Sequence, residues 1–287
     1  LELLTLGSVA ISSPVIAKVA RDNHEKPDIK FGLVTYQWGK DWDIPTLIKN
    51  LTKSKNLGVE LRVDHAHGVD TFLTSAQREC VKKQFKDSPV TLVGFGSNVQ
   101  FDSPVPGVLN LNIKRAKALI ALDHDIGGSG VKVKPNQFHK DVPKEKTIEQ
   151  IGKSLNEIGK FAGDLGQKVR LEVHGPGTQE LPNIKAILDV ADNPNVGICW
   201  NCNPTDLNPD FQTNFDLVKN RLGSTIHIHE LDIPGYPYDL LFKNLVGLNY
   251  NGWLLFECSA TDPADKVKAL DEQRQLGLKM LSQLHVK

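Results

Sequence analysis

The segment from Ser224 to Asp232 carries the residue types most able to do chemistry. It reads S-T-I-H-I-H-E-L-D, so His227 and His229 alternate with isoleucines. In a β-strand, alternate side chains point to opposite faces, which would put both imidazoles on one face. Imidazoles near the end of a strand, followed by Asp232, suit metal ligation or acid/base catalysis, and a structural role is the alternative.

Three further strand-like segments also end in polar groups. Glu172 lies in V-R-L-E-V-H, Asn201 ends V-G-I-C-W-N, and Glu257 ends G-W-L-L-F-E. Two carboxylates can flank a substrate carbon, so that one takes a proton and the other returns it. Carboxylates and imidazoles at one mouth can also hold Mn, Mg, Co or Zn, which would stabilise an enediolate. Glu172 and Glu257 are therefore candidates for such a proton-transfer pair or for metal ligands.

Other polar and aromatic residues follow or line the predicted strands. We expect substrate contacts from seven of them: Trp38, His65, His67, Lys132, His174, His227 and Asp232. Trp38 would offer its indole face to the C–H groups of a sugar, and core packing is its alternative. His227 could instead be a hydrogen-bonded interior histidine, and Asp232 could orient a neighbour or the loop.

These residues need a framework, and the chain provides alternating strands and helices. Strands are predicted at 31–36, 58–63, 90–96, 130–133, 169–173, 196–200, 224–229 and 253–256. Helices are predicted at 44–56, 74–86, 111–122, 147–165, 181–190, 211–222, 238–246 and 263–284. Asp43 and Pro45 mark the first helix start. Eight such units predict a single-domain α/β fold, a (β/α)8 TIM barrel, whose active site lies where the strands end. A doubly wound sheet is disfavoured because no glycine-rich turn follows the first strand.

The motifs resemble the xylose isomerase-like TIM-barrel superfamily, the sugar phosphate isomerase/epimerase group that also contains endonuclease IV. The resemblance covers residues 29–285 and is carried by F-G-L-V-T-Y, G-V-E-L-R, L-E-V-H, V-G-I-C-W-N, H-I-H-E-L-D and G-W-L-L-F-E. It implies one divalent metal ion on Glu172, Asn201, His229 and Glu257, with the two glutamates as the acid/base pair. Asn201 departs from the family's aspartate, and its amide oxygen brings no charge to a metal.

The resemblance implies an isomerase or epimerase that acts on a monosaccharide or a keto-sugar. Two alternatives stay open: a 3-keto-glycoside lyase or hydrolase-type enzyme, and a sugar-binding barrel that has lost its metal. A pure binder has little reason to bury two uncompensated carboxylates. A DNA-repair endonuclease is disfavoured because 34 basic and 34 acidic residues give zero net charge. A carbohydrate is therefore the expected partner, nucleic acid is not, and a homo-oligomer is compatible with the sequence.

Composition and the N-terminal segment set the remaining expectations. The chain is 40% hydrophobic and 24% charged, as in globular proteins. No segment reaches the roughly 18 apolar residues that span a bilayer. Residues 1–28 are predicted to be a signal-peptide remnant or packed arm plus linker, which favours a periplasmic or secreted protein over a cytoplasmic one. Cys199 and Cys202 have redox-pair spacing, but an apolar strand around Cys199 favours packing.

Overall fold

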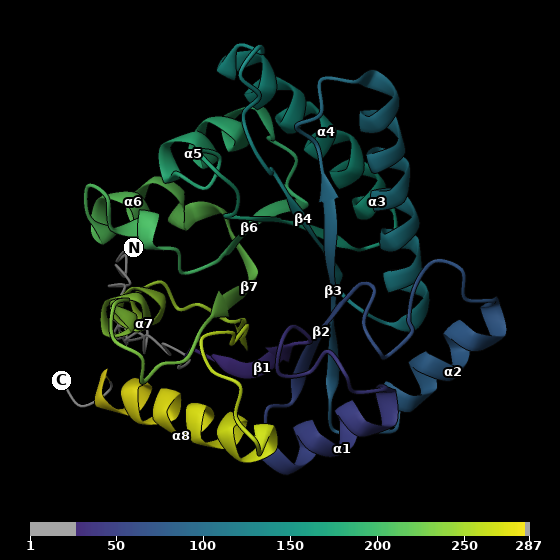
Figure 1. Cartoon of the computed structure of the whole chain (residues 1–287), viewed down its shortest axis with the longest axis vertical. Coiled ribbons are helices and arrows are strands. Elements are labelled where there is room, and N and C mark those ends of the chain that lie inside the picture. The colour runs from purple at the N-terminus through teal and green to yellow at the C-terminus, as the bar shows by residue number, and fades with distance from the viewer. Residues whose placement is uncertain (1–26, 285–287) are drawn as a thin grey trace, which may run out of the picture.

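The computed structural model describes residues 27–284, which form a closed barrel of eight parallel strands surrounded by helices (Figure 1). The strands are β1 (Lys30–Val34), β2 (Gly58–Arg62), β3 (Thr91–Gln100), β4 (Gly130–Lys134), β5 (Lys168–Glu172), β6 (Val196–Trp200), β7 (Leu222–Ile228) and β8 (Trp253–Phe256). The helices are α1 (Ile44–Ser54), α2 (Ser75–Lys86), α3 (Pro106–Ile126), α4 (Lys144–Asp164), α5 (Leu181–Val190), α6 (Phe211–Val218), α7 (Tyr238–Gly247) and α8 (Lys266–Leu284). The predicted TIM barrel is confirmed.

Barrel closure brings the two ends of the strand series together. In β1, Leu33 pairs with Val59 of β2 on one side and with Phe256 of β8 on the other. All the pairs are parallel, so the C-terminal ends of the strands meet at one mouth. Leu47 and Leu51 of α1 are fully buried, as expected for a helix that packs on the barrel.

The first helix begins as its sequence predicts. The Asp43 carboxylate accepts a hydrogen bond of 2.9 Å from the main-chain N–H of Thr46. Pro45 occupies the first turn, where its missing N–H costs no helical hydrogen bond. The helix ends at Ser54, and Lys55, which follows it, adopts a left-handed conformation. Local residue types therefore fix the start of α1, whereas its end has a lysine in a conformation that usually favours glycine.

The third helix and the third strand both extend beyond their predicted bounds. The third helix begins at Pro106, so the predicted start at residue 111 was wrong by more than one turn. Pro106 lies in the first turn, a position that proline tolerates, and the loop-like composition there concealed the helix start. Strand β3 continues to Gln100 beyond the predicted end at Gly96, and its register with β4 shifts between these two residues.

Residues 1–26 and 285–287 lie outside the described part of the chain, and the predicted signal remnant falls there. Within residues 27–284, no helix combines the length and apolar character needed to cross a membrane.

Candidate active site

Three strands bring Glu172, His227 and Glu257 together. Glu172 ends β5, His227 lies one residue before the end of β7, and Glu257 follows β8 directly. The Nδ1 atom of His227 lies 3.5 Å from Glu172 Oε1 and 3.2 Å from Glu257 Oε2. One ligand atom from each residue lies within 4.8 Å of the other two, so the group could hold a metal ion.

A third carboxylate that was not among the predicted site residues completes this cluster. Glu60 of β2 is fully buried, and its Oε1 lies 3.2 Å from His227 Nε2. Gly96 of β3 leaves room for this carboxylate, because a Cβ atom at that position would lie 2.6 Å from Glu60 Oε1 and would displace it. The signal in the sequence was an acidic residue inside the apolar run around V-E-L.

A buried lysine pairs with one of the glutamates. Lys132 Nζ lies 2.8 Å from Glu172 Oε2, and the two side chains are 1% and 2% exposed. Lys134 Nζ lies 3.8 Å from the same oxygen. Burial lowers the pKa of Lys132, but the charges of Glu172 and two other glutamates outweigh burial and raise it to about 12. Lys132 is therefore an ammonium ion inside the barrel.

The same charges set the ionisation of Glu172 and Glu257, the predicted acid/base pair. Burial opposes ionisation of Glu172, but Lys132 and then His227 hold its pKa well below the usual value. His227 lowers the pKa of Glu257 against the effect of burial. Burial also opposes protonation of His227, yet Cys199, Glu257 and Glu60 raise its pKa well above 6.5. Both glutamates are thus ionised, and the proton of the cluster resides on His227.

His229 and Asn201, the other two predicted ligands, lie beside this cluster. The Nδ1 and Nε2 atoms of His229 lie 3.2 and 3.3 Å from the main-chain oxygens of Glu257 and Asn201. Asn201 is buried, and its side-chain oxygen has no hydrogen-bond partner among the described residues. The structure therefore brings His227 rather than His229 together with both glutamates, and it leaves one amide oxygen of Asn201 free.

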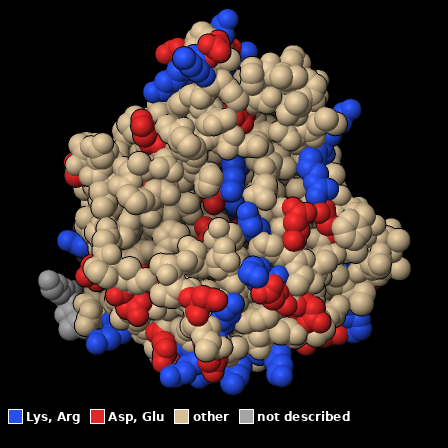
Figure 2. Space-filling view, viewed as in Figure 1, with Lys and Arg blue, Asp and Glu red and all other residues tan. Residues whose placement is uncertain are grey.

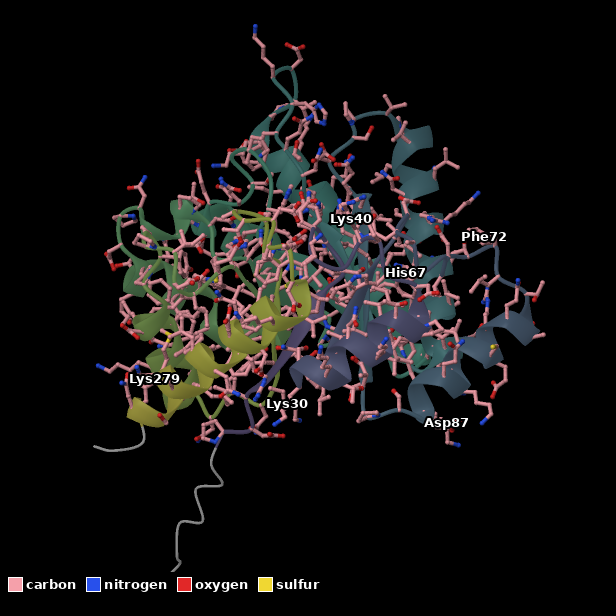
Figure 3. The ribbon with its side chains drawn as sticks, turned by 60° about the horizontal axis from the view of Figure 1, so that its bottom comes forward. Lys30, Lys40, His67, Phe72, Asp87 and Lys279 are labelled. Atoms are coloured by element: carbon pink, nitrogen blue, oxygen red, sulfur yellow. The ribbon has the colours of Figure 1, made fainter. Side chains whose placement is uncertain are left out.

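The two histidines after β2 are engaged by their own loop. His67 Nε2 lies 2.7 Å from the Arg62 carbonyl, and its Nδ1 accepts the N–H of Val69 at 3.1 Å. His65 Nε2 lies 3.2 Å from a guanidinium nitrogen of Arg62. In this segment His67 is 7% exposed, whereas Phe72 is 75% exposed (Figure 3, which labels both). Because both ring nitrogens of His67 bond to main-chain groups, we leave it out of the proposed site.

The remaining predicted contacts differ in accessibility. Trp38 is 3% exposed, and its indole N–H donates to the carbonyl of Thr261 at 2.9 Å. Asp232 is exposed and accepts a hydrogen bond of 2.7 Å from Gln273. His174 is half-buried, with an Nδ1 that has no partner among the described residues. Of the three, His174 has a polar atom available for a substrate.

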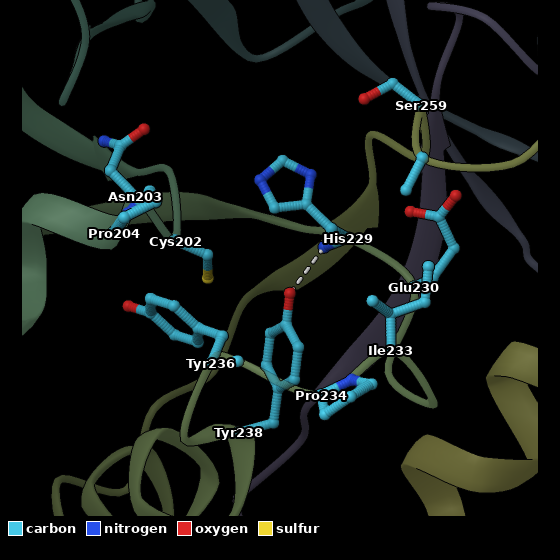
Figure 4. Close-up of a pocket in the computed structure, with 12 residues that line it drawn as sticks. Cys202, Asn203, Pro204, His229, Glu230, Ile233, Pro234, Tyr236, Tyr238 and Ser259 are labelled. Carbon is cyan, nitrogen blue, oxygen red and sulfur yellow. Dashed lines mark hydrogen bonds between the residues drawn. The ribbon is translucent and has the colours of Figure 1, made fainter.

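A pocket of about 370 Å³ opens at this mouth beside His229 (Figure 4). Tyr236 and Tyr238 line it, and the hydroxyl of Tyr238 accepts the main-chain N–H of His229 at 3.0 Å. Glu230 also lines it and keeps one buried oxygen without a partner among the described residues. Aromatic faces next to a few polar groups suit a sugar ring. Figure 2 shows basic and acidic side chains close together near the centre of the viewed face.

The cysteines of the C-x-x-C segment are free thiols. Cys199 lies buried within β6, and Cys202 follows the strand and is also buried. Burial raises the pKa of the Cys202 thiol well above its usual value. A thiol that stays protonated is a poor nucleophile, so this segment favours packing over redox chemistry.

Comparisons with known proteins agree with this geometry. A family model described as a xylose isomerase-like TIM barrel matches residues 48–281. The fold is similar to that of 3-keto-D-glucoside 4-epimerase from E. coli (TM-score 0.71, 16% identity, 86% of this chain and 100% of that one). It is similar to that of L-ribulose 3-epimerase (TM-score 0.75, 15% identity, 89% of this chain and 95% of that one). It is also similar to that of the IolI protein with a bound zinc atom (TM-score 0.72, 13% identity, 90% of this chain and 100% of that one). No curated protein matches the sequence significantly.

Proposed function

Because the chain belongs to the xylose isomerase-like TIM-barrel family, we propose that it is a sugar isomerase or epimerase that moves a proton next to a carbonyl group. The observation that carries the proposal is the buried pair Glu172 and Glu257, whose carboxylates both approach Nδ1 of His227. Proteins of similar fold include a 3-keto-D-glucoside 4-epimerase, an L-ribulose 3-epimerase and a D-psicose 3-epimerase, which supports that substrate class.

The proposed reaction needs one base and one acid on opposite sides of a carbon. One carboxylate removes the proton, and the C–H electron pair moves toward the carbonyl, whose oxygen becomes negative. The other carboxylate, protonated beforehand, returns a proton to the opposite face. His227 can supply that proton because it lies 3.2 Å from Glu257 Oε2. Glu257 is the more accessible glutamate, with a side chain 13% exposed against 2% for Glu172.

The distance between the carboxylates of Glu172 and Glu257 restricts how a substrate can bind. The oxygens that approach His227 lie within 4.8 Å of each other. A carbon between them needs about 3 Å on each side for proton transfer. The substrate would therefore part the two carboxylates by at least roughly 1 Å, since twice about 3 Å exceeds their present separation. We assign Lys134 and His174 to contacts with a substrate bound between the two carboxylates.

A divalent ion could enter the site only against the charge of the buried Lys132 ammonium, 2.8 Å from Glu172 Oε2, and none of the proposed proton transfers passes through such an ion. Glu172, His227 and Glu257 would hold it, and the free amide oxygen of Asn201 is a further oxygen donor nearby. When bound, such an ion would polarise the carbonyl oxygen of the substrate. The zinc atom in the IolI structure supports a metal in a barrel of this fold.

A 3-keto-glycoside lyase is the second candidate, because elimination also begins with proton removal next to a carbonyl. The similar fold of a 3-keto-D-glucoside 4-epimerase favours testing that substrate class. A sugar-binding barrel is the third candidate; Lys132 and His227 compensate the charges of the two glutamates, so only the turnover test below separates it from an enzyme. Export and a homo-oligomer stay predictions.

The test is proton exchange in heavy water. Keto-pentoses, keto-hexoses and 3-keto-glucosides would be incubated with the protein in D2O, and deuterium uptake followed by NMR. We expect one deuterium in an epimerised or isomerised product. Glu172→Gln and Glu257→Gln should lower the rate by several orders of magnitude, with the exposed Glu157→Gln as the control. Release of an aglycone would identify the lyase. Calorimetric binding without exchange or turnover would refute the enzyme.

A further inference from the structure

Lys132 is a buried cation in the site that the proposed proton transfers do not use. It reaches the inside of the barrel from β4, next to Glu172 on the neighbouring strand β5. Its ammonium makes one hydrogen bond among the described residues, to Glu172 Oε2 at 2.8 Å. An ammonium has three N–H donors, so two are left for another acceptor. A side chain that is 1% exposed cannot satisfy both with bulk water.

The charges around Lys132 leave little need for a second cation. Glu60, Glu172 and Glu257 all act on Lys132, and they supply the negative charge of the site. Lys132 and Lys134 bring two positive charges to the same oxygen of Glu172. A divalent ion on Glu172 would stand a few ångströms from these ammonium groups and be repelled by both. Asn201, at the fourth expected ligand position, adds no charge to offset that repulsion.

We propose that the Lys132 ammonium replaces the metal ion in this site. It stabilises the negative oxygen that forms on the substrate, and its charge makes the wild-type chain a weak binder of divalent ions. The catalytic half of this inference rests on the proposed sugar chemistry, whereas the metal-binding half does not. As the C–H bond breaks, its electron pair forms the new C=C bond, and the π pair of the carbonyl moves onto the oxygen, which accepts a hydrogen bond from Lys132 Nζ. Lys132 keeps its proton throughout, and the pair returns when the second carboxylate protonates the carbon.

The test is metal affinity, measured on the folded full chain. Wild type, Lys132→Met, Lys132→Arg and the surface control Lys117→Met would be stripped with chelator and titrated with Mn²⁺ and Zn²⁺. We expect wild type, Lys132→Arg and the control to bind weakly. Lys132→Met should bind about one equivalent at least 100-fold more tightly, because a buried positive charge beside the ligands has been removed. Folding of each variant would be checked by circular dichroism.

Two results would overturn the inference. One is a wild-type protein that retains one equivalent of metal after purification and binds it with submicromolar affinity. The other is a folded Lys132→Met protein that binds the ions no more tightly than wild type. If Lys132→Met fails to fold, the wild-type titration still decides, since a tight native site contradicts the proposal by itself.

Turnover provides the second readout and separates this inference from the proposed function. With a substrate in hand, we expect wild-type deuterium exchange to survive chelation and to fall at least about 100-fold in Lys132→Met. Exchange abolished by chelator and restored by an ion would refute the role of Lys132 while supporting the sugar enzyme. Absence of any sugar turnover would refute the proposed function, and the metal affinities would still test Lys132.

Discussion

Replacing Glu172 with Gln should destabilise the protein even though it removes a buried charge. Lys132, 1% exposed, would lose its partner at 2.8 Å and stay charged inside the barrel. Breaking a buried ion pair by removing one partner costs about 3–5 kcal/mol. We expect about 3 kcal/mol, the lower end, because the charges of Glu60 and Glu257 also act on Lys132 and would still be present.

A double-mutant cycle measures this coupling. The free energy of unfolding would be obtained from urea denaturation for wild type, Glu172→Gln, Lys132→Met and the double variant. The double variant removes both charges, so no unpaired ammonium stays buried. We therefore expect it to be more stable than Glu172→Gln by about 2 kcal/mol. The coupling energy should fall little in high salt, since buried pairs are weakly screened.

An exposed pair of similar geometry provides the control. Lys117 and Glu157 lie 2.7 Å apart, with side chains 34% and 51% exposed. Their cycle should give less than about 1 kcal/mol, as for most surface ion pairs. A coupling between Lys132 and Glu172 as small as that of the surface pair would refute the reasoning, because Lys132 would then not depend on Glu172.

Three further outcomes are expected. Gly96→Ala should displace Glu60, since the added Cβ would lie 2.6 Å from Glu60 Oε1. The melting temperature should fall by several degrees, and an unchanged value would contradict the tight fit. Burial raises the pKa of Asp123 from 3.8 to about 8. Between those pH values the folded protein holds a proton that the unfolded chain has lost, so stability falls as pH rises, by up to about 1.4 kcal/mol per pH unit, and levels off above pH 8. Asp123→Asn should remove that contribution in urea unfolding at pH 5 to 8, and a slope equal to wild type would count against it. Asp43→Ala should cost about 1 kcal/mol through the lost cap of α1, whereas Asp41→Ala, next to the cap, should cost little in the same unfolding assay.

The barrel could be predicted from the sequence because its elements are local. Strand runs such as V-G-I-C-W and the helix start at Asp43 and Pro45 depend on residues close together in the chain. Eight repeats of that pattern allow few architectures, and the closed barrel follows. Glu172 and Glu257 could be singled out for the same reason, since each stands at the end of a strand whose period is visible in the sequence.

Which side chains meet inside the barrel was decided only by the tertiary structure. His227 and His229 share one strand face in the sequence, yet the structure directs the first to the glutamates and the second to main-chain carbonyls. Lys132 and Glu172 are 40 residues apart, and the ion pair depends on the register of β4 and β5. Glu60 joins them because Gly96 leaves room for its carboxylate. The hydrophobic period and the residue types of the sequence determine on which face of a strand a side chain lies. Strand register and the space left by neighbouring side chains determine which residues it contacts.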